Sequence, residues 1–170
     1  MLTFLSRNDL PDIMALQDAV WKDLQLAGKT RFIVPRGEDY FIRHMDTPHL
    51  ICGIRDESGR LIAQAIHHNA YPFNVKQETG LDTLPNLLEN DYVTTLQGAL
   101  VHPLNRKQGL MGKLITDWLQ QSANMRFAVA RVEVSHEASH AAFIKFGFEI
   151  VGMVADARDD ASVHVLLKQL

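Results

Sequence analysis

The sequence predicts a single α/β domain in which helices cover a mixed sheet. Short apolar runs typical of strands alternate along the chain with segments whose apolar residues recur at helical spacing. No internal repeat, low-complexity tract or Gly/Ser-rich linker interrupts this alternation. Because 170 residues suffice for one sizeable core and are too few for two comfortable ones, we expect one domain over residues 1–170.

The first half of the chain should form a strand, two helices and a hairpin. Apolar residues recur at helical spacing from Ile13 to Leu24, and Gly28 ends that helix. A turn cluster at 56–59 separates two apolar runs that are typical of an antiparallel pair. The expected elements are a strand at 2–6, a helix from about 9 to 28, a shorter helix from about 37 to 45, and strands at 50–55 and 61–67.

The second half alternates strands and helices after an irregular stretch at residues 71–91. Pro103 stops a long strand, and Gly147 closes a short helix. The last two strands are expected to pair across a polar turn at 158–160. The expected elements are strands at 92–101, 127–134, 148–156 and 163–168, and helices at 109–125 and 138–146.

Composition narrows the function before any motif is considered. The formal net charge of -3 argues against a nucleic-acid partner, because a phosphate backbone favours a basic face. No apolar run is long enough to span a bilayer, and the apolar start of the chain is too short for a signal peptide. Cys52 is the only cysteine, which excludes an intrachain disulfide, and we expect it to be a buried strand residue. A cytoplasmic protein without a membrane partner fits these observations.

The segment from 100 to 115 is the most informative part of the sequence. A buried strand runs into a polar, basic turn, and that turn opens an amphipathic helix. Gly109 and Gly112 stand in the first helical turn, where a glycine lets a ligand approach the backbone closely. The first amides of a helix are unpaired and the helix dipole is positive there, so they form an anion site suited to phosphate. Arg106 and Lys107 add formal positive charge to it.

Two better-known phosphate motifs do not fit this segment. A Walker loop needs a glycine at position 107 and a Ser or Thr after Lys113, where the sequence has Lys107 and Leu114. A dinucleotide fingerprint also needs a glycine at position 107. An ordinary strand-to-helix connection, with glycines that only help the helix to pack, is the alternative to an anion site.

The sequence around this turn resembles the GNAT N-acetyltransferase superfamily. Residues 101–103 (Val-His-Pro) and 106–111 (Arg-Lys-Gln-Gly-Leu-Met) stand where that family carries Val-x-Pro and Arg/Gln-x-x-Gly-x-Gly/Ala, with Met111 in place of the small third residue. Residues 136–148 look like the family's Asn-x-Ala-Ser-x-x-x-Tyr-x-Lys-x-Gly-Phe. The two motifs occupy about residues 92–150. The resemblance implies a mostly antiparallel central sheet, splayed at the cofactor site and flanked by helices.

The resemblance also implies an activity. Members of the family move an acyl group such as acetyl from coenzyme A to an amine, with acetyl-CoA or another acyl-CoA as co-substrate and no metal. The acceptor would be the amine of a small molecule or a peptide, and a homodimer is compatible with the family. The loop's amides would bind the pyrophosphate, and the preceding strand would pair with pantetheine. The implied cofactor contacts are Leu100, Val101, Arg106, Lys107, Gln108, Gly109, Leu110, Met111, Gly112, His136, Ser139 and Phe143.

Two departures from the family pattern leave the catalytic residues unassigned. Phe143 stands where many members place a tyrosine that protonates the departing thiolate, and phenylalanine has no proton to give. The strand at 92–101 carries no carboxylate that could act as a base. His67, His68 and His140 are candidate bases, although His67 and His68 also fit a strand pair with one residue on each face. A non-catalytic acyl-CoA-binding protein with the same fold is therefore the first alternative.

The acceptor site is less readable. In the family it is shaped by the segments that correspond here to residues 21–45 and 71–91. Acidic groups in the second segment would attract a cationic amine, and a solvated loop is the alternative. These groups are Glu78, Asp82, Glu89 and Asp91.

A zinc metallopeptidase is the second alternative, because residues 136–140 also spell His-Glu-x-x-His. On a helix this motif would place two imidazoles on one face, with Glu137 as a base. The context argues against it, since the predicted helix is short and ends at Gly147. A third ligand would have to be Glu149 or His164, both in predicted strands.

Overall fold

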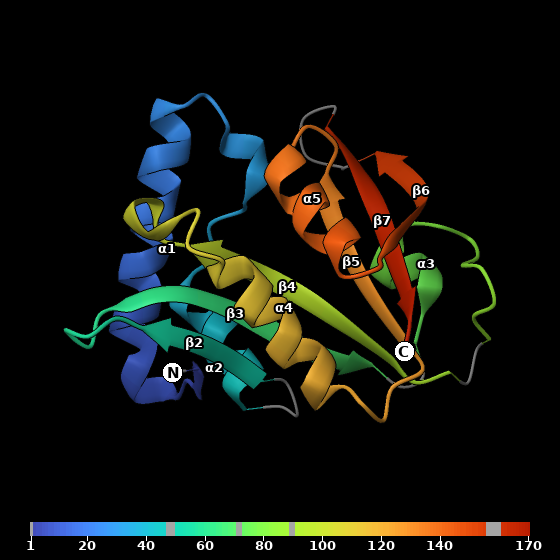
Figure 1. The fold of residues 1–170 in the computed structure, drawn as a ribbon, viewed down its shortest axis with the longest axis horizontal. Helices are drawn as coiled ribbons and strands as arrows, with labels where there is room; N and C mark the ends of the chain where they lie inside the picture. Colours follow the sequence, from blue (N-terminus) through green and yellow to red (C-terminus); the bar gives the residue numbers. More distant parts are fainter. Residues whose placement is uncertain (1, 47–49, 71–72, 89–90, 156–160) are drawn as a thin grey trace. The chain divides into compact units, whose positions relative to one another are not determined.

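The computed structural model describes residues 2–46, 50–70, 73–88, 91–155 and 161–170 (Figure 1). Its strands follow the order β1-β2-β3-β4-β5-β7-β6 in one seven-stranded sheet. The strands are β1 Leu2–Phe4, β2 Leu50–Arg55, β3 Leu61–Ala70, β4 Val93–Val101, β5 Phe127–Glu133, β6 Glu149–Ala155 and β7 Ser162–Gln169. The α-helices are α1 Leu10–Leu26, α2 Glu38–Met45, α3 Val75–Thr79, α4 Leu110–Gln121 and α5 Glu137–Lys145, and the 3-10 turns are η1 Arg7–Asp9, η2 Thr30–Phe32 and η3 Pro103–Asn105.

The predicted α/β class, with helices flanking a mixed and mostly antiparallel sheet, is confirmed. The pairs β1 with β2, β2 with β3, β5 with β7, and β6 with β7 are all antiparallel. Both predicted hairpins are therefore present, although the turn at 158–160 lies outside the described residues. Among the described helices, none combines the length and the apolar character that a membrane crossing requires.

Where the structure describes it, the stretch 71–91 that the sequence predicts to be irregular contains one short helix, α3. The side chain of Asn74 caps it by accepting a hydrogen bond from the Gln77 amide at 2.9 Å, and Gly80 ends it with a φ of 83°. Five residues are too few to show a helical repeat of apolar side chains, so periodicity could not reveal this helix. Only its capping residues could have signalled it.

The contacts within the chain define two compact units, which we describe separately: Met1–His68 with Leu96–Asp117, and Asn69–Thr95 with Trp118–Leu170. In the first unit, α1 and α2 pack on one face of β2 and β3. The apolar residues that recur along α1 all point into this core, as the helical spacing predicts. The core residues are Leu5, Ile13, Leu16, Val20, Leu24, Phe41, Ile51, Leu61, Ile66 and Leu100.

The opposite face of β2 and β3 carries a different set of side chains. Because successive strand residues alternate between faces, Cys52 and its partner Ala65 point away from the α1 core, and His67 points the same way as Ala65. Asp117 of α4 reaches this face, since ligand atoms of Cys52, His67 and Asp117 all lie within 4.8 Å of one another. The predicted burial of Cys52 is confirmed, with no exposed surface.

The second unit has its own apolar core between its strands and the segment around α3. Gly152 of β6 allows a close approach here, because a Cβ at this position would stand 2.6 Å from Leu81 Cδ1. Trp118 is fully buried, and its Nε1 donates a hydrogen bond to Thr94 Oγ1 at 2.8 Å. The core residues are Phe73, Leu84, Val93, Phe127, Val129, Val165 and Leu167.

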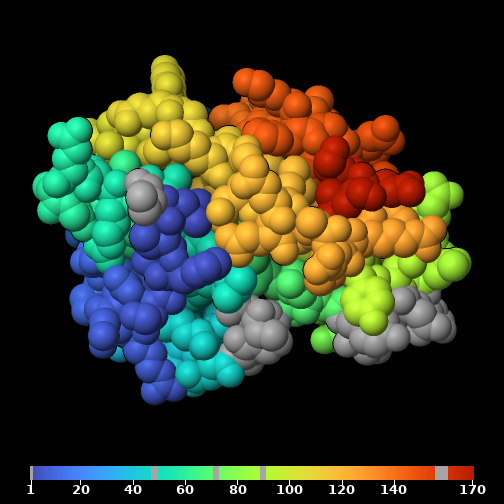
Figure 2. Space-filling view, turned by 60° about the horizontal axis from the view of Figure 1, so that its bottom comes forward, coloured from blue at the N-terminus to red at the C-terminus, as the bar shows by residue number. Residues whose placement is uncertain are grey.

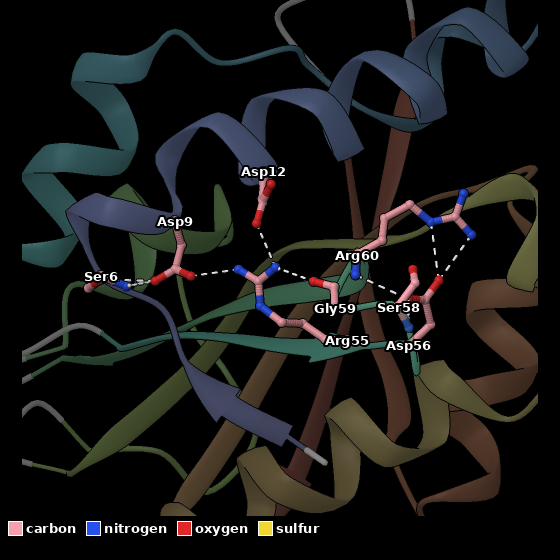
Figure 3. Close-up of polar contacts among 8 residues, drawn as sticks. All are labelled: Ser6, Asp9, Asp12, Arg55, Asp56, Ser58, Gly59 and Arg60. Atoms are coloured by element: carbon pink, nitrogen blue, oxygen red, sulfur yellow. Dashed lines mark hydrogen bonds and ion pairs between the residues drawn. The ribbon is translucent and has the colours of Figure 1, made fainter.

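Arg55, at the end of β2, ties the start of the first helical segment to the β2–β3 hairpin (Figure 3). Its guanidinium donates to Asp9 Oδ1 at 2.6 Å, to Asp12 Oδ2 at 2.5 Å and to the Gly59 carbonyl at 2.6 Å. Asp9 also accepts hydrogen bonds from the amide and hydroxyl of Ser6. The Ser6 amide, with help from the Ser6 hydroxyl and Arg55, holds the pKa of Asp9 below its ordinary value, although burial opposes the shift.

Replacing Arg55 by lysine should lower the free energy of unfolding by about 1–2 kcal/mol. A lysine ammonium is a single point of charge and cannot hold two carboxylates and a carbonyl in the fork that a guanidinium provides. Arg60→Lys is the matched control. Arg60 is half-exposed and, among the described residues, pairs with one carboxylate, that of Asp56, which should make the change worth less than about 0.5 kcal/mol. Urea unfolding of both variants measures the difference. Equal losses would contradict a special role for the Arg55 bridge.

Candidate functional site

The end of β4 departs from regular strand geometry at Gly98. Its φ of +54° lies in the left-handed region, which strongly favours glycine. A Cβ at this position would stand 3.4 Å from Ile66 Cδ1, so the backbone also lies close to β3 here. Beyond Gly98 the strand continues to Val101, with Leu100 buried in the α1 core and Val101 half-buried.

The loop after β4 is held in place at its start and bends sharply towards α4. The amide of His102 donates to the Ile62 carbonyl of β3 at 2.8 Å. Lys107 and Gly109 then adopt left-handed φ values of 62° and 74°. Residues 106–109 are all exposed, and Figure 2 shows this part of the chain, in yellow, projecting from the surface. The loop therefore presents its backbone, as well as its side chains, to the outside.

The first amides of α4 point out of the helix without a helical partner. The first bond of the helix runs from the Lys113 amide to the Gly109 carbonyl at 3.1 Å. Helix geometry leaves the three preceding amides, of Leu110, Met111 and Gly112, without an acceptor four residues back. Such amides, together with the positive end of the helix dipole, are suited to an anion, which is the role that the sequence predicts for this turn.

Arg106 has a partner that the sequence could not reveal. Its Nη1 lies 2.6 Å from Asp23 Oδ2 of α1, in a pair with both side chains about two-fifths exposed. The loop nevertheless keeps a positive environment at His102. Burial and the nearby charges of Arg60 and Arg106 lower the pKa of His102, against an opposing effect of Asp56. An anion at this loop would meet cationic neighbours.

The structure brings the predicted contacts 100–112 together in the first unit, along the end of β4, the loop and the start of α4. Leu100 and Leu110 bury their side chains, so only their backbones can serve a ligand. The remaining predicted contacts, at 136–143, belong to the second unit. There His136 caps α5 by accepting from the Ser139 amide at 3.4 Å, and its Nε2 lies 3.3 Å from Ser139 Oγ.

Phe143 is buried, with 3% of its surface exposed. Its ring packs edge-to-face against Phe148, with 5.2 Å between the ring centroids. The side chain thus forms part of the apolar packing of the second unit, and it offers no hydrogen-bonding group.

The zinc interpretation of residues 136–140 does not have the context that it needs. His136 stands before the helix as its N-cap rather than inside it, so the motif does not lie within one helix. The helix itself has only nine residues. His140 Nε2 lies 3.0 Å from Nδ1 of His164, and no third ligand joins this pair in the described part of the chain to form a metal-binding group.

The two adjacent histidines of β3 lie on opposite faces, as predicted. His67 is 3% exposed, and burial lowers its pKa to about 4, with a weaker opposing effect of Asp117. His68 is half-buried on the α1 side, and its Nδ1 lies 3.5 Å from Gln97 Nε2 of β4. Of the two, only His68 has a side chain that is partly open to a substrate.

Tyr40 extends the polar row formed by His68 and Gln97. Its hydroxyl lies 3.4 Å from Gln97 Oε1, and the Arg36 guanidinium stands 4.8 Å from its ring centroid. Burial raises the pKa of Tyr40, although Arg36 opposes this. The sequence could present Tyr40 only as one of several aromatic residues before β2, because nothing in a local pattern joins positions 40, 68 and 97. We call Tyr40, His68 and Gln97 the polar row.

Two of the acidic residues in the segment 71–91 form ion pairs within the chain. Asp91 is buried and pairs with Arg126 at 2.5 Å, and its other oxygen accepts from the Leu88 amide. Asp82 is exposed and pairs with Lys76 at 2.7 Å. Glu89 lies outside the described residues. Asp91 therefore stabilises the second unit. The exposed Asp82 fits the alternative of a solvated loop rather than an acidic acceptor site.

Comparison with known proteins identifies the fold. Neither a protein-family model nor a curated protein sequence matches the chain. Among solved structures it is similar to the ribosomal-protein-S18-alanine N-acetyltransferase of Escherichia coli, at a TM-score of 0.71 and 15% identity over 99% of this chain and 92% of that one. It is also similar to NAA60 of Arabidopsis thaliana in complex with acetyl-CoA, at a TM-score of 0.74 and 11% identity over 100% of this chain and 98% of that one.

A third similar structure is the ribosomal-protein-alanine N-acetyltransferase of Brucella melitensis, at a TM-score of 0.72 and 17% identity over 100% of this chain and 99% of that one. At such identities the likeness concerns the fold. The chain has the fold of the GNAT N-acetyltransferases, as the two sequence motifs predict.

Proposed function

We propose that this protein is an acyl-CoA-dependent N-acyltransferase that transfers an acyl group such as acetyl to an amine. The observation that carries the proposal is the loop between β4 and α4. Its Lys107 and Gly109 have left-handed φ values, and the first three amides of α4, which have no acceptor within the helix, follow directly. The same loop carries the first sequence motif. The fold similarity to NAA60, whose structure contains acetyl-CoA, supports the same assignment.

In this proposal the pyrophosphate of coenzyme A accepts hydrogen bonds from the amides of residues 109–112. Arg106 and Lys107 add cationic charge beside it, and the absence of a side chain at Gly112 keeps the backbone accessible. The backbone of Leu100 and Val101, beyond the kink at Gly98, pairs with the pantetheine arm. Gln108, Leu110 and Met111 complete the loop, and the cofactor contacts that the family motif implies at His136, Ser139 and Phe143 stay predictions from the sequence. The proposal requires no metal.

The transfer itself needs a neutral amine and a polarised thioester. The amine nitrogen forms a bond to the acyl carbonyl carbon, the carbon–sulfur bond breaks, and coenzyme A leaves as a thiol after taking up a proton. The amine loses one proton, and His68 is our candidate to accept it, since imidazole is suited to proton transfer near neutral pH. Gln97 would orient His68. Phe143 cannot supply the proton to sulfur, so that proton would come from water or from the acceptor.

An amine panel with acetyl-CoA tests the proposed activity through the release of free thiol. The panel should contain small polyamines, amino acids, aminoglycosides, peptides with free N-termini and lysine-containing peptides. Release that depends on one class of amine, and that falls at least about tenfold in His68→Ala, supports an enzyme with this base. Tight binding of acetyl-CoA with no release across the panel favours the alternative of a non-catalytic acyl-CoA-binding protein, which Phe143 and the carboxylate-free β4 also suggest.

Reversing the charge of Arg106 should weaken acetyl-CoA binding by at least about tenfold. Arg106→Glu places a carboxylate beside both the proposed pyrophosphate position and Asp23, so repulsion acts on the ligand and on the loop. Asp23→Asn is the matched control, because it breaks the same ion pair while leaving Arg106 free to face the ligand. Calorimetry should show equal or tighter binding in the control. Equal weakening in both variants would mean that the ion pair, rather than the charge of Arg106, matters to the ligand.

A further inference from the structure

The first unit contains a buried group of potential metal ligands that the proposed acyl transfer does not use. Cys52 of β2, His67 of β3 and Asp117 of α4 each offer a ligand atom, and these atoms lie within 4.8 Å of one another. They come from three different elements, on the face of β2 and β3 that points away from the α1 core. Among the described residues no other group of three such side chains converges in this way.

The geometry of the pair Cys52 and His67 already matches that of a zinc site. Cys52 Sγ lies 3.7 Å from His67 Nδ1. Two ligands of a tetrahedral zinc ion, with Zn–S of about 2.3 Å and Zn–N of about 2.0 Å, stand about 3.6 Å apart. The two side chains therefore need almost no movement to share one ion. The Asp117 carboxylate would be the third protein ligand. Its oxygen lies within 4.8 Å of the ligand atoms of Cys52 and His67, so a small movement would bring it to the ion.

The burial of Cys52 favours a metal ligand over a reactive, nucleophilic thiol. Cys52 has no exposed surface and His67 is 3% exposed, so a substrate could not reach the sulfur for nucleophilic chemistry. His67 Nδ1, which faces Cys52 Sγ, is the ring nitrogen placed to bind the ion, and coordination fixes the position of such a ring. Asp117 is only partly buried, which leaves a route for an ion on the α4 side.

We propose that Cys52, His67 and Asp117 hold a zinc ion, with a water molecule as its fourth ligand, and that this ion fastens α4 to β2 and β3. A thiolate, an imidazole and a carboxylate are all established zinc ligands, and the mixture of sulfur, nitrogen and oxygen favours zinc over calcium or magnesium. On binding, Cys52 releases its proton to solvent and the sulfur binds as a thiolate. The ion would hold the helix whose first turn forms the loop described above, and the site stands independently of the proposed acyl transfer.

Cobalt titration of the metal-stripped protein, in a non-thiol reductant, tests this site directly. Bound Co²⁺ should give one equivalent of a thiolate-to-cobalt charge-transfer band and the intense visible bands of a four-coordinate ion, and zinc should displace it. Cys52→Ser should abolish the charge-transfer band. His67→Gln and Asp117→Asn should each weaken binding by more than the roughly 10- to 100-fold typical of outer-shell losses.

Two controls keep the result decisive. His68→Gln changes the neighbouring imidazole on the opposite face of β3 and should leave cobalt affinity unchanged. Because Cys52 and His67 are core residues, circular dichroism should first show that each variant folds. Asp117 is partly exposed, so Asp117→Asn should fold and still tests the site if the other two variants do not. Failure of the wild-type protein to give the charge-transfer band would overturn the proposal. So would binding that survives Cys52→Ser unchanged, since that would place the ion elsewhere, for example at His140 and His164.

Discussion

Gly109→Ala should weaken acetyl-CoA binding by at least about tenfold, which corresponds to about 1.4 kcal/mol. Gly109 has a φ of +74°, and nothing lies within 4 Å of the position that its Cβ would take. The methyl group therefore meets no protein atom, but it would occupy the space through which a phosphate approaches the backbone. The substitution also forces alanine into a left-handed conformation, at a cost to folding of about 1–2 kcal/mol.

Gly59→Ala separates the two effects. Gly59 has a φ of +85°, its Cβ position is equally open, and it lies in the turn of the β2–β3 hairpin. We expect a similar loss of stability in both variants by urea unfolding, and a loss of acetyl-CoA affinity in Gly109→Ala alone by calorimetry. If Gly109→Ala bound as tightly as the wild-type protein, the ligand would not lie on this loop, whatever its affinity.

Lowering the pH from 6.5 to about 4 should reduce the free energy of unfolding by roughly 3 kcal/mol through His67 alone. In the unfolded chain the imidazole takes up a proton near its ordinary pKa of 6.5, whereas burial delays this in the folded chain until about pH 4. Between these values the unfolded state binds more protons, so stability falls as the pH falls. The loss of stability is absent above pH 6.5 and reaches its full size once the pH has fallen to about 4, the pKa of His67 in the folded chain.

His67→Gln provides the comparison, because glutamine stays neutral across this range. Urea unfolding at several pH values, with a chelator present to exclude metal binding, should show a shallower dependence in the variant between pH 6.5 and 4. His102 contributes a smaller slope of the same sign in both proteins, since its pKa is also lowered. Superimposable profiles for the two proteins would show that His67 titrates normally and is not buried as the structure has it.

The strands, the long helices and the loop between β4 and α4 could be predicted because each rests on neighbouring residues. Strand alternation placed His67 and His68 on opposite faces, and Pro103 with Gly109 marked a turn between a strand and a helix. Such signals are local: a proline, a glycine or a repeat of apolar side chains acts within a few positions. The loop at 106–112 is continuous in sequence, so its geometry was accessible from sequence alone.

The pairings between distant elements were not accessible in this way. Arg106 meets Asp23 across 83 positions, and Asp117 meets Cys52 through the packing of a helix on a sheet. Tyr40, Gln97 and His68 likewise come from α2, β4 and β3. No local pattern encodes these contacts, because they depend on the order of strands and on which face a helix covers. The short helix α3 was missed for a different reason, since five residues do not reveal a period.

Calorimetric titration of the purified wild-type protein with acetyl-CoA tests the central claim most directly. We expect saturable one-to-one binding at micromolar strength that is unaffected by a chelator, because the proposed site consists of backbone amides and cationic side chains. An analogue without the pyrophosphate, such as an acetylated pantetheine, should bind more weakly. Absence of binding, or equal affinity for acetyl-CoA and acetylated pantetheine, would contradict the assignment of the β4–α4 loop as a coenzyme A site.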